Sequence, residues 1–468
     1  MDLWNNFQLR GCRSNLHEKF LLFLSIKCKA LIKSKLLLEI ESQVDTVPPK
    51  RIDIALLDAF FILHLIKRIP PTFGQLARKI LIDVCQYKAK TIHVVFDKHV
   101  GISIKDVERD IRRAVNVPYR IEGPAQVTPG NWELALKNGY FKIELVRFLI
   151  GYWAENHLAS IIGDKFFFVN YNDVCFSFNA YNGVVVKIEE MELYNTHEEA
   201  DNGIVYHLTA IQQRQKDVVT NIVVRTRDTD ILVILLGCKD MLDPRLHIWM
   251  EVGQASLNDL RYTEINKVYN TLGRDVCLAL LAFHAFTGCD YDSAFCRRGK
   301  VNPFRQLRKN PDAIRVFGKL CCIVENNCDI SYEDFLILQN FVCKMYGQGK
   351  VFSVNQARVN CFFKKFKPNK KDKLLSCSNK FDSTVIPPCE KVLKLKLLRT
   401  IFIARRWRSS FTSVLPDDPL YCGWNFDDEA GTYAIKWYEG ERRPPLSEVI
   451  DDNQHGPDLQ DETEKKLV

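Results

Sequence analysis

The chain has 468 residues, of which 47% are hydrophobic and 26% charged, and its formal net charge is +8. This composition excludes a wholly disordered chain, and the length predicts two or three folded units rather than one small domain. The surplus of positive charge favours an acidic partner such as a nucleic acid.

Cysteine spacing and hydrophobic runs bear on the cellular compartment. Sixteen cysteines are spread along the chain without the paired CxxC spacing of a zinc site. The amino-terminal residues do not have the pattern of a signal peptide, and no run approaches the roughly 18 uncharged apolar residues of a spanning helix. We therefore expect an intracellular protein with reduced thiols, and the lysine-rich KFKPNKKDK favours the nucleus.

The predicted elements begin after a basic, leucine-rich extension that ends at VPPKR. IDIALLD is typical of a buried strand, FGQLARKILIDVCQY has helical spacing, and TIHVVFD is typical of a second strand. A strand, a helix and a strand at this spacing predict a βαβ unit and therefore a parallel sheet.

The next segments alternate between helical and β patterns. Residues 98–115 are charged with helical spacing, whereas FFFVNYNDVCFSFNAYNGVVVKI is broken by Asn-Asp and Asn-Gly and predicts one or two hairpins. THEEADNGIVYHLTAIQQRQ predicts a helix, NIVVRT a strand, ILVILLG a strand or short helix, and DVCLALLAFHAFTG a buried helix.

These patterns predict four regions. We expect a basic extension at 1–50, an α/β core at 51–300 with a β-rich insertion at about 115–195, a helical, basic region at 301–445, and an acidic, disordered tail at 446–468.

Seven carboxylates share a position at the end of an apolar element or at the start of a helix. They are Asp58, Asp97, Glu199, Asp201, Asp228, Asp230 and Asp290. Chemistry in an open parallel sheet gathers at the carboxyl ends of the strands, so these side chains would converge if the strands are neighbours. Such a cluster repels itself without cations and suits two Mg²⁺ or Mn²⁺ ions about 3.5–4 Å apart, which can hydrolyse a phosphodiester.

Each acid alone also has a structural explanation. Asp58 and Asp97 could form turns at strand ends, residues 196–199 fit a capping box, and residues 228–230 fit an ordinary turn. Glu198 and Asp292 are expected to be bystanders. The joint pattern, rather than any single acid, favours a metal site.

The motifs LLDAFFILH, HVVFD, HEEAD, RDTDILV and FTGCDY, in this order, resemble the five acidic motifs of the flap endonuclease and xeroderma-group-G nuclease superfamily. The pattern HEEAD, DTD and HAFTGCD also resembles an uncharacterised, mobile-element-related group of animal proteins. The resemblance covers about residues 50–300. It implies a PIN-like, three-layer α/β/α domain with a mostly parallel central sheet, in which the seven acids hold two divalent ions and hydrolyse phosphodiester bonds of DNA.

The resemblance also implies basic residues that steer the scissile phosphate, on the helix after the second acid. The candidates there are Lys98, Lys105, Arg109, Arg112 and Arg113. A second basic segment, interleaved with phenylalanines, adds Lys364, Lys365 and Lys367, which could lie along a phosphate backbone. A solvated helix face or a lysine-rich loop is the alternative explanation for both sets.

The leading alternative function is a catalytically silent PIN-like protein that binds nucleic acid or another protein. A haloacid-dehalogenase-type phosphatase also uses D-x-D, but its signature requires Thr or Val where this chain has Leu232. A thiol hydrolase built on Cys289 and His284 would need an exposed, activated cysteine, which a helix-end cysteine in an apolar run is not expected to be.

Overall fold

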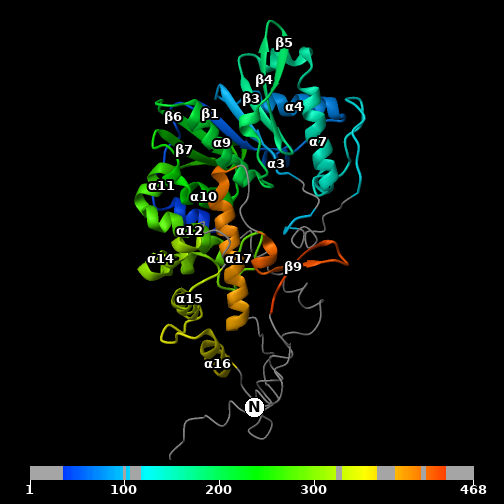
Figure 1. Cartoon of the computed structure of the whole chain (residues 1–468). Helices are drawn as coiled ribbons and strands as arrows, with labels where there is room; N and C mark the ends of the chain where they lie inside the picture. The colour runs from blue at the N-terminus through cyan, green and yellow to red at the C-terminus, as the bar shows by residue number, and fades with distance from the viewer. Residues whose placement is uncertain are drawn as a thin grey trace, which may run out of the picture.

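An eight-stranded sheet organises the chain (Figure 1). The structure is a computed structural model that describes residues 35–98, 102–105, 117–322, 329–365, 385–412 and 418–438. In the order in which they lie in the sheet, the strands are β5 (Val184–Glu189), β4 (Val174–Tyr181), β3 (Phe166–Tyr171), β2 (Thr91–Val95), β1 (Ile54–Asp58), β6 (Thr220–Arg225), β7 (Leu246–Val252) and β8 (Arg261–Glu264).

The centre of the sheet is parallel and its edges are antiparallel. Strands β3, β2, β1, β6 and β7 pair in parallel, while β4 and β5 extend one edge and β8 the other as antiparallel strands. The chain is therefore an α/β protein with a large, mostly parallel sheet. Because β1 pairs with β2 on one side and β6 on the other, the direction of strand succession reverses at β1.

Helices connect and cover the strands. The α-helices are α3 (Ala59–His64), α4 (Phe73–Cys85), α6 (Trp132–Ala135), α7 (Gly139–Tyr152), α8 (Ala159–Ile162), α9 (Ala200–Arg214), α10 (Thr229–Gly237), α11 (Ile265–Leu272), α12 (Arg274–Phe286), α13 (Val301–Leu307), α14 (Pro311–Leu320), α15 (Tyr332–Met345), α16 (Val354–Lys365) and α17 (Glu390–Arg408). The 3-10 helices are η1 (Asn156–Leu158), η2 (Met191–Leu193), η3 (Lys239–Met241), η4 (Ala255–Leu257), η6 (Ser409–Phe411) and η7 (Pro419–Tyr421). A separate hairpin is formed by β9 (Trp424–Asp427) and β10 (Thr432–Ile435).

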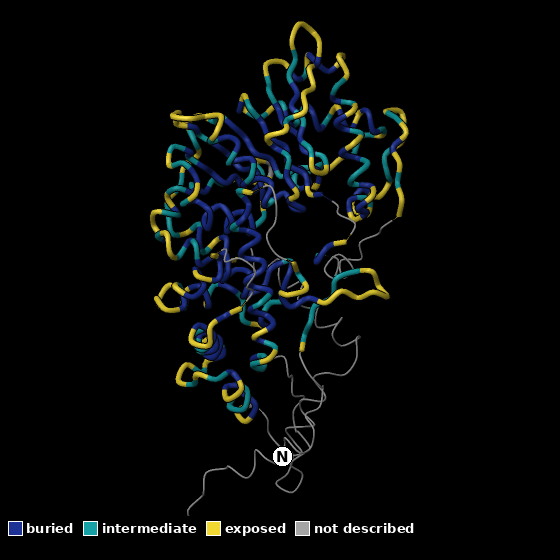
Figure 2. The backbone as a smooth tube through the Cα atoms, viewed as in Figure 1, coloured by how far each residue is buried: buried dark blue, intermediate teal, exposed yellow. Residues whose placement is uncertain are grey.

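The central strand β1 serves two cores because its side chains alternate between the faces of the sheet. Ile54 and Leu56 join the cluster that includes α9, α10, α12 and α17, whereas Ala55 and Leu57 join the cluster that includes α3, α4, α7 and α8. Helices on both faces give three layers. In Figure 2 the buried residues follow the strands and the helices packed directly upon them.

Most elements expected from the sequence are confirmed. Strands β1, β2 and β6 and helices α4, α9 and α12 coincide with their predicted segments, and ILVILLG belongs to helix α10. The aromatic segment forms β3, β4 and β5, with turns at Asn172 and at Asn182-Gly183, where the backbone takes positive φ. Strand β3 pairs in parallel with β2, so this segment is part of the main sheet.

The two ends of the described chain pack on the core. Residues 35–41 are helical. The side chains of Leu36, Leu37 and Ile40 are buried in the core cluster that includes α9, α10, α12 and α17. The helical character expected beyond residue 300 is confirmed by α13 to α17, of which α17 packs against α12 (Figure 1). The tail expected at 446–468 lies outside the described residues.

Within the described ranges, no helix combines the length and the apolar character needed to cross a membrane. Eleven of the described cysteines are free thiols and Cys422 is disulfide-bonded.

Candidate metal centre

Three of the expected acids lie where three adjacent strands end. Asp58 is the last residue of β1, Asp97 follows β2 by two residues, and Asp228 follows β6 by three. The parallel registers align these strands, so their carboxyl ends lie together on one side of the sheet. Open α/β sheets bind their ligands at the carboxyl ends of the strands, at the point where strand succession reverses.

Three carboxylates meet most closely. One oxygen from each of Asp201, Asp228 and Asp230 lies within 4.8 Å of the others. Asp228 is the N-cap of α10, and its Oδ1 accepts a hydrogen bond from the backbone N–H of Asp230 at 2.9 Å. Asp201 lies in the first turn of α9, which packs against α10. The partial positive charge at both helix starts stabilises the acids placed there.

Asp58 and Asp97 flank this triad and are held by hydrogen bonds. The Asp58 carboxylate accepts from the backbone N–H of Phe61 and from the hydroxyl of Thr226, both at 3.1 Å. The Asp97 carboxylate accepts from the backbone N–H of Ala200 at 2.7 Å and so tethers the start of α9 to the end of β2. The turn explanation for these acids is thus compatible with their place in the cluster.

The cluster is electrostatically unfavourable as a set of bare anions. Burial, followed by the negative charges of Asp97 and Asp228, raises the pKa of Asp58 to about 7. Burial raises the pKa of Asp201 well above its usual value, and the negative charges of Asp228 and Asp230 add to this rise. At an effective dielectric constant of about 20, two unit charges this close repel by about 3–4 kcal/mol. Asp230 is buried, Asp58, Asp201 and Asp228 are half-buried, and Asp97 is exposed. A set of carboxylates with only hard oxygen donors matches the ligand chemistry of Mg²⁺ and Mn²⁺.

Glu199 is paired with a cation. It is buried and is the N-cap residue of α9, but its side chain makes no capping hydrogen bond, and α9 begins at Ala200. The capping-box explanation is therefore wrong. The carboxylate forms an ion pair with Lys105, whose ammonium also lies 5.0 Å from the ring centre of Tyr291 and offsets part of the rise in the pKa of Asp201.

Asp290 lies in the loop after α12 and is half-buried. Gly288, two residues earlier, has a φ of +112°, and a Cβ there would lie 2.6 Å from atoms of Ala294. The turn therefore requires glycine. Burial, with contributions from Asp201 and other neighbours, raises the pKa of Tyr291, so the residue after Asp290 is within electrostatic range of the cluster.

The basic candidates have different surroundings. Lys98 is buried, and its ammonium contacts the carboxylate of Asp173 and both oxygens of Asn195, so we reassign it to a structural role. Lys105 lies at the cluster, and Lys364 is exposed on α16. Arg109, Arg112, Arg113 and Lys367 and the side chain of Lys365 lie outside the described residues.

The two expected bystanders are buried ion-pair residues that bind helix α17. The Asp292 carboxylate accepts from Lys396 at 2.9 Å and from Arg399 at 3.0 Å, and these cations hold its pKa below the usual value despite burial. Glu198 pairs with Arg406 at 3.3 Å. These ion pairs with α17 were not predicted from the sequence. The only sequence signal is the series of cations within the otherwise apolar run KLKLLRTIFIARRWR.

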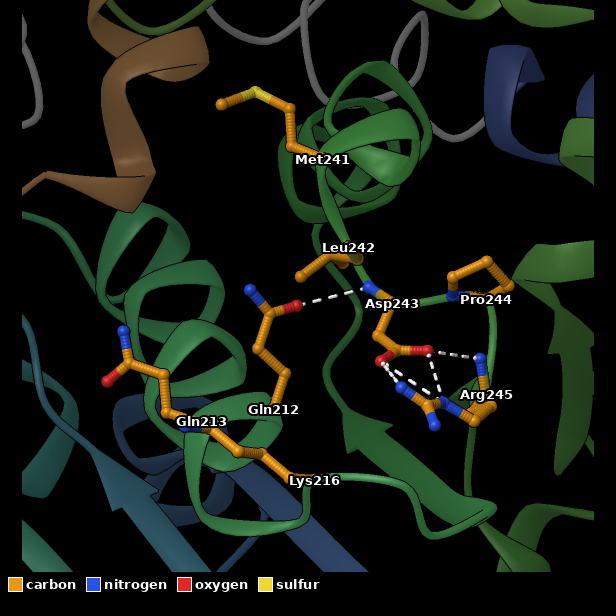
Figure 3. Close-up of a pocket in the computed structure, with 8 residues that line it drawn as sticks. All are labelled: Gln212, Gln213, Lys216, Met241, Leu242, Asp243, Pro244 and Arg245. Atoms are coloured by element: carbon orange, nitrogen blue, oxygen red, sulfur yellow. Dashed lines mark hydrogen bonds and ion pairs between the residues drawn. The ribbon is translucent and has the colours of Figure 1, made fainter.

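An open pocket of about 650 Å³ lies elsewhere (Figure 3). Its lining residues, Gln212, Gln213, Lys216 and Met241 to Arg245, come from the end of α9 and from the approach to β7. The pocket therefore lies at the amino ends of β6 and β7, whereas the carboxylates lie at the carboxyl ends of the strands. Arg245 is ion-paired with Asp243 and Asp217, so its charge is already balanced. A second hollow adjoins the cluster and is lined by Asp97, Lys142 and Asn170 among others.

No protein-family model and no curated protein matches this chain.

Proposed function

We propose that the protein is a metal-dependent phosphodiesterase with a PIN-like fold that cleaves nucleic acid, with DNA as the expected substrate. The observation that carries the proposal is the approach of Asp201, Asp228 and Asp230 to within 4.8 Å at the switch point of a parallel sheet. Asp58 and Asp97 adjoin them, and burial together with the neighbouring acids raises the pKa of Asp58 and of Asp201.

The residues that would hold two Mg²⁺ or Mn²⁺ ions are the triad with Asp58 and Asp97. Glu199 pairs with Lys105 at the border of the cluster, and Asp290 is a candidate ligand from the motif resemblance. When bound, such ions activate water and stabilise the leaving oxygen of a phosphodiester. The hydrogen bonds from Phe61, Thr226 and Ala200 keep the carboxylates oriented before metal arrives. This preorganisation reduces the cost of assembling the site.

Lys105 has a defined part in this proposal. It is partly exposed and pairs with Glu199 at the border of the cluster. An incoming phosphate would compete with Glu199 for this ammonium and would release that carboxylate towards the metal. Lys105 is thus the described basic candidate best placed to contact the scissile phosphate.

The competing function is a catalytically silent nucleic-acid-binding protein, which the net charge of +8 favours. A cleavage assay separates the two. The full chain is incubated with Mn²⁺ or Mg²⁺ and with single-stranded, duplex, flapped and hairpin DNA and RNA. We expect cleavage that falls more than about 100-fold in Asp228→Asn and in Asp230→Asn, because each variant removes an anionic ligand while preserving size.

The matched control is Asp164→Asn. Asp164 is an exposed aspartate that precedes β3 and so lies at the amino ends of the parallel strands, away from the carboxylates. Its substitution should leave cleavage unchanged. Nucleic-acid binding without cleavage, equal in the wild type and both site variants, would support the silent protein instead. Cleavage that persists in both site variants would refute the proposed site.

A further inference from the structure

The innermost carboxylate of the triad has a histidine partner. Asp230 is 2% exposed and His284 is fully buried. The Nε2 atom of His284, on α12, lies 2.8 Å from Oδ1 of Asp230, at the start of α10. The two residues are 54 positions apart in the chain, and the packing of α10 against α12 brings them together.

His284 is held in place by two further contacts, one with its ring and one with its backbone. Its ring packs against the indole of Trp407 on α17, with ring centres 5.9 Å apart. Its backbone carbonyl accepts a hydrogen bond from the ammonium of Lys300 at 2.6 Å, and the same ammonium binds the hydroxyl of Thr287 at 2.8 Å. The end of α12 is thereby fixed, and with it the direction of the ring.

We propose that His284 is a positioning residue that donates its Nε2 hydrogen to Asp230 and so holds this carboxylate in the orientation that faces Asp201 and Asp228. This inference deepens the proposed function and rests on it. An ionised carboxylate can only accept, so the hydrogen of this bond belongs to the imidazole. His284 contacts a ligand of the metal rather than the reacting atoms, and partners of this kind set the orientation of ligating side chains.

A purely packing role predicts something different. If His284 only filled space, an apolar side chain of similar volume would serve the metal site as well as a hydrogen-bond donor would. If it positions Asp230, full metal affinity requires the hydrogen-bond donor. Glutamine can place an amide N–H near the Nε2 position, whereas leucine supplies volume without a donor, and the shorter asparagine cannot reach the carboxylate.

The test measures Mn²⁺ affinity of the full chain by isothermal titration calorimetry, so its readout does not depend on activity. We expect His284→Leu to weaken binding about 10–100-fold and His284→Gln to stay within about threefold of the wild type. The matched control is His207→Leu, because His207 is also fully buried and contacts another side chain, His93, rather than an acid of the cluster. Its Mn²⁺ affinity should equal that of the wild type.

Each outcome decides the question. Equal Mn²⁺ affinity in His284→Leu and the wild type would overturn the positioning role while leaving the proposed function intact. Absence of Mn²⁺ binding by the wild type would instead overturn the proposed function, and the inference with it. If His284→Leu fails to fold, the comparison passes to His284→Gln and His284→Asn: weaker binding in the asparagine variant alone supports the proposal, and equal binding in both refutes it.

Discussion

Replacing Asp58 with asparagine should stabilise the metal-free protein at alkaline pH. Burial and two neighbouring acids raise the pKa of Asp58 from its ordinary value of 3.8 to about 7. The folded state therefore holds this proton more tightly than the unfolded state does. Below pH 3.8 the carboxyl is protonated in both states and costs nothing, and the free energy of unfolding falls as the pH rises towards 7.

The size of this effect follows from the pKa shift. Each pKa unit corresponds to about 1.4 kcal/mol, so a shift from 3.8 to about 7 costs the folded state about 4 kcal/mol once the carboxyl is ionised. Asparagine removes the charge but still offers an oxygen to the backbone N–H of Phe61, and it caps helices as well as aspartate does. We expect Asp58→Asn to gain about 2–4 kcal/mol at pH 8, allowing for the loss of a charged acceptor.

The assay is urea unfolding of the wild type and Asp58→Asn in EDTA at a series of pH values from about 4 to 8. The stability difference should be near zero at the acidic end and largest at pH 8. Replacing EDTA with saturating Mn²⁺ should narrow the difference by about 2.7 kcal/mol, because a metal ion at 100 times its dissociation constant adds about that much to a protein that binds it. A variant that is no more stable than the wild type at pH 8 in EDTA would refute the electrostatic reasoning.

Three further predictions concern the surroundings of the site. Asp292→Asn should lower the free energy of unfolding by about 3–5 kcal/mol in urea, because it leaves two buried cations of α17 without their counter-ion. Gly288→Ala should cost about 2–4 kcal/mol in the same assay, since its φ is +112° and its Cβ would lie 2.6 Å from Ala294. Burial lowers the pKa of His207 to about 3, so the wild type should lose about 1.6 kcal/mol between pH 6.5 and pH 5 that His207→Leu does not lose, measured by urea unfolding at both pH values.

Local patterns in the sequence determined most of the element types and where the acids stand along them. Periodicity and turn residues depend on neighbours within a few positions, which is why β1, β2, β6, α4 and α9 were predicted with their types. An aspartate at the end of an apolar run is also a local feature. The set of seven acids, as a candidate metal site, was therefore accessible from the sequence.

Tertiary structure alone decided which acids meet and what else holds them. The triad requires α9 and α10 to pack side by side, and its flanking acids require β1 to lie between β2 and β6. The partners of the buried charges are also distant in sequence: Asp292 binds cations 104 and 107 residues away, and Lys98 binds Asn195, 97 residues away. The strength of a charge interaction depends on distance in space and on burial, and neither is encoded by spacing along the chain.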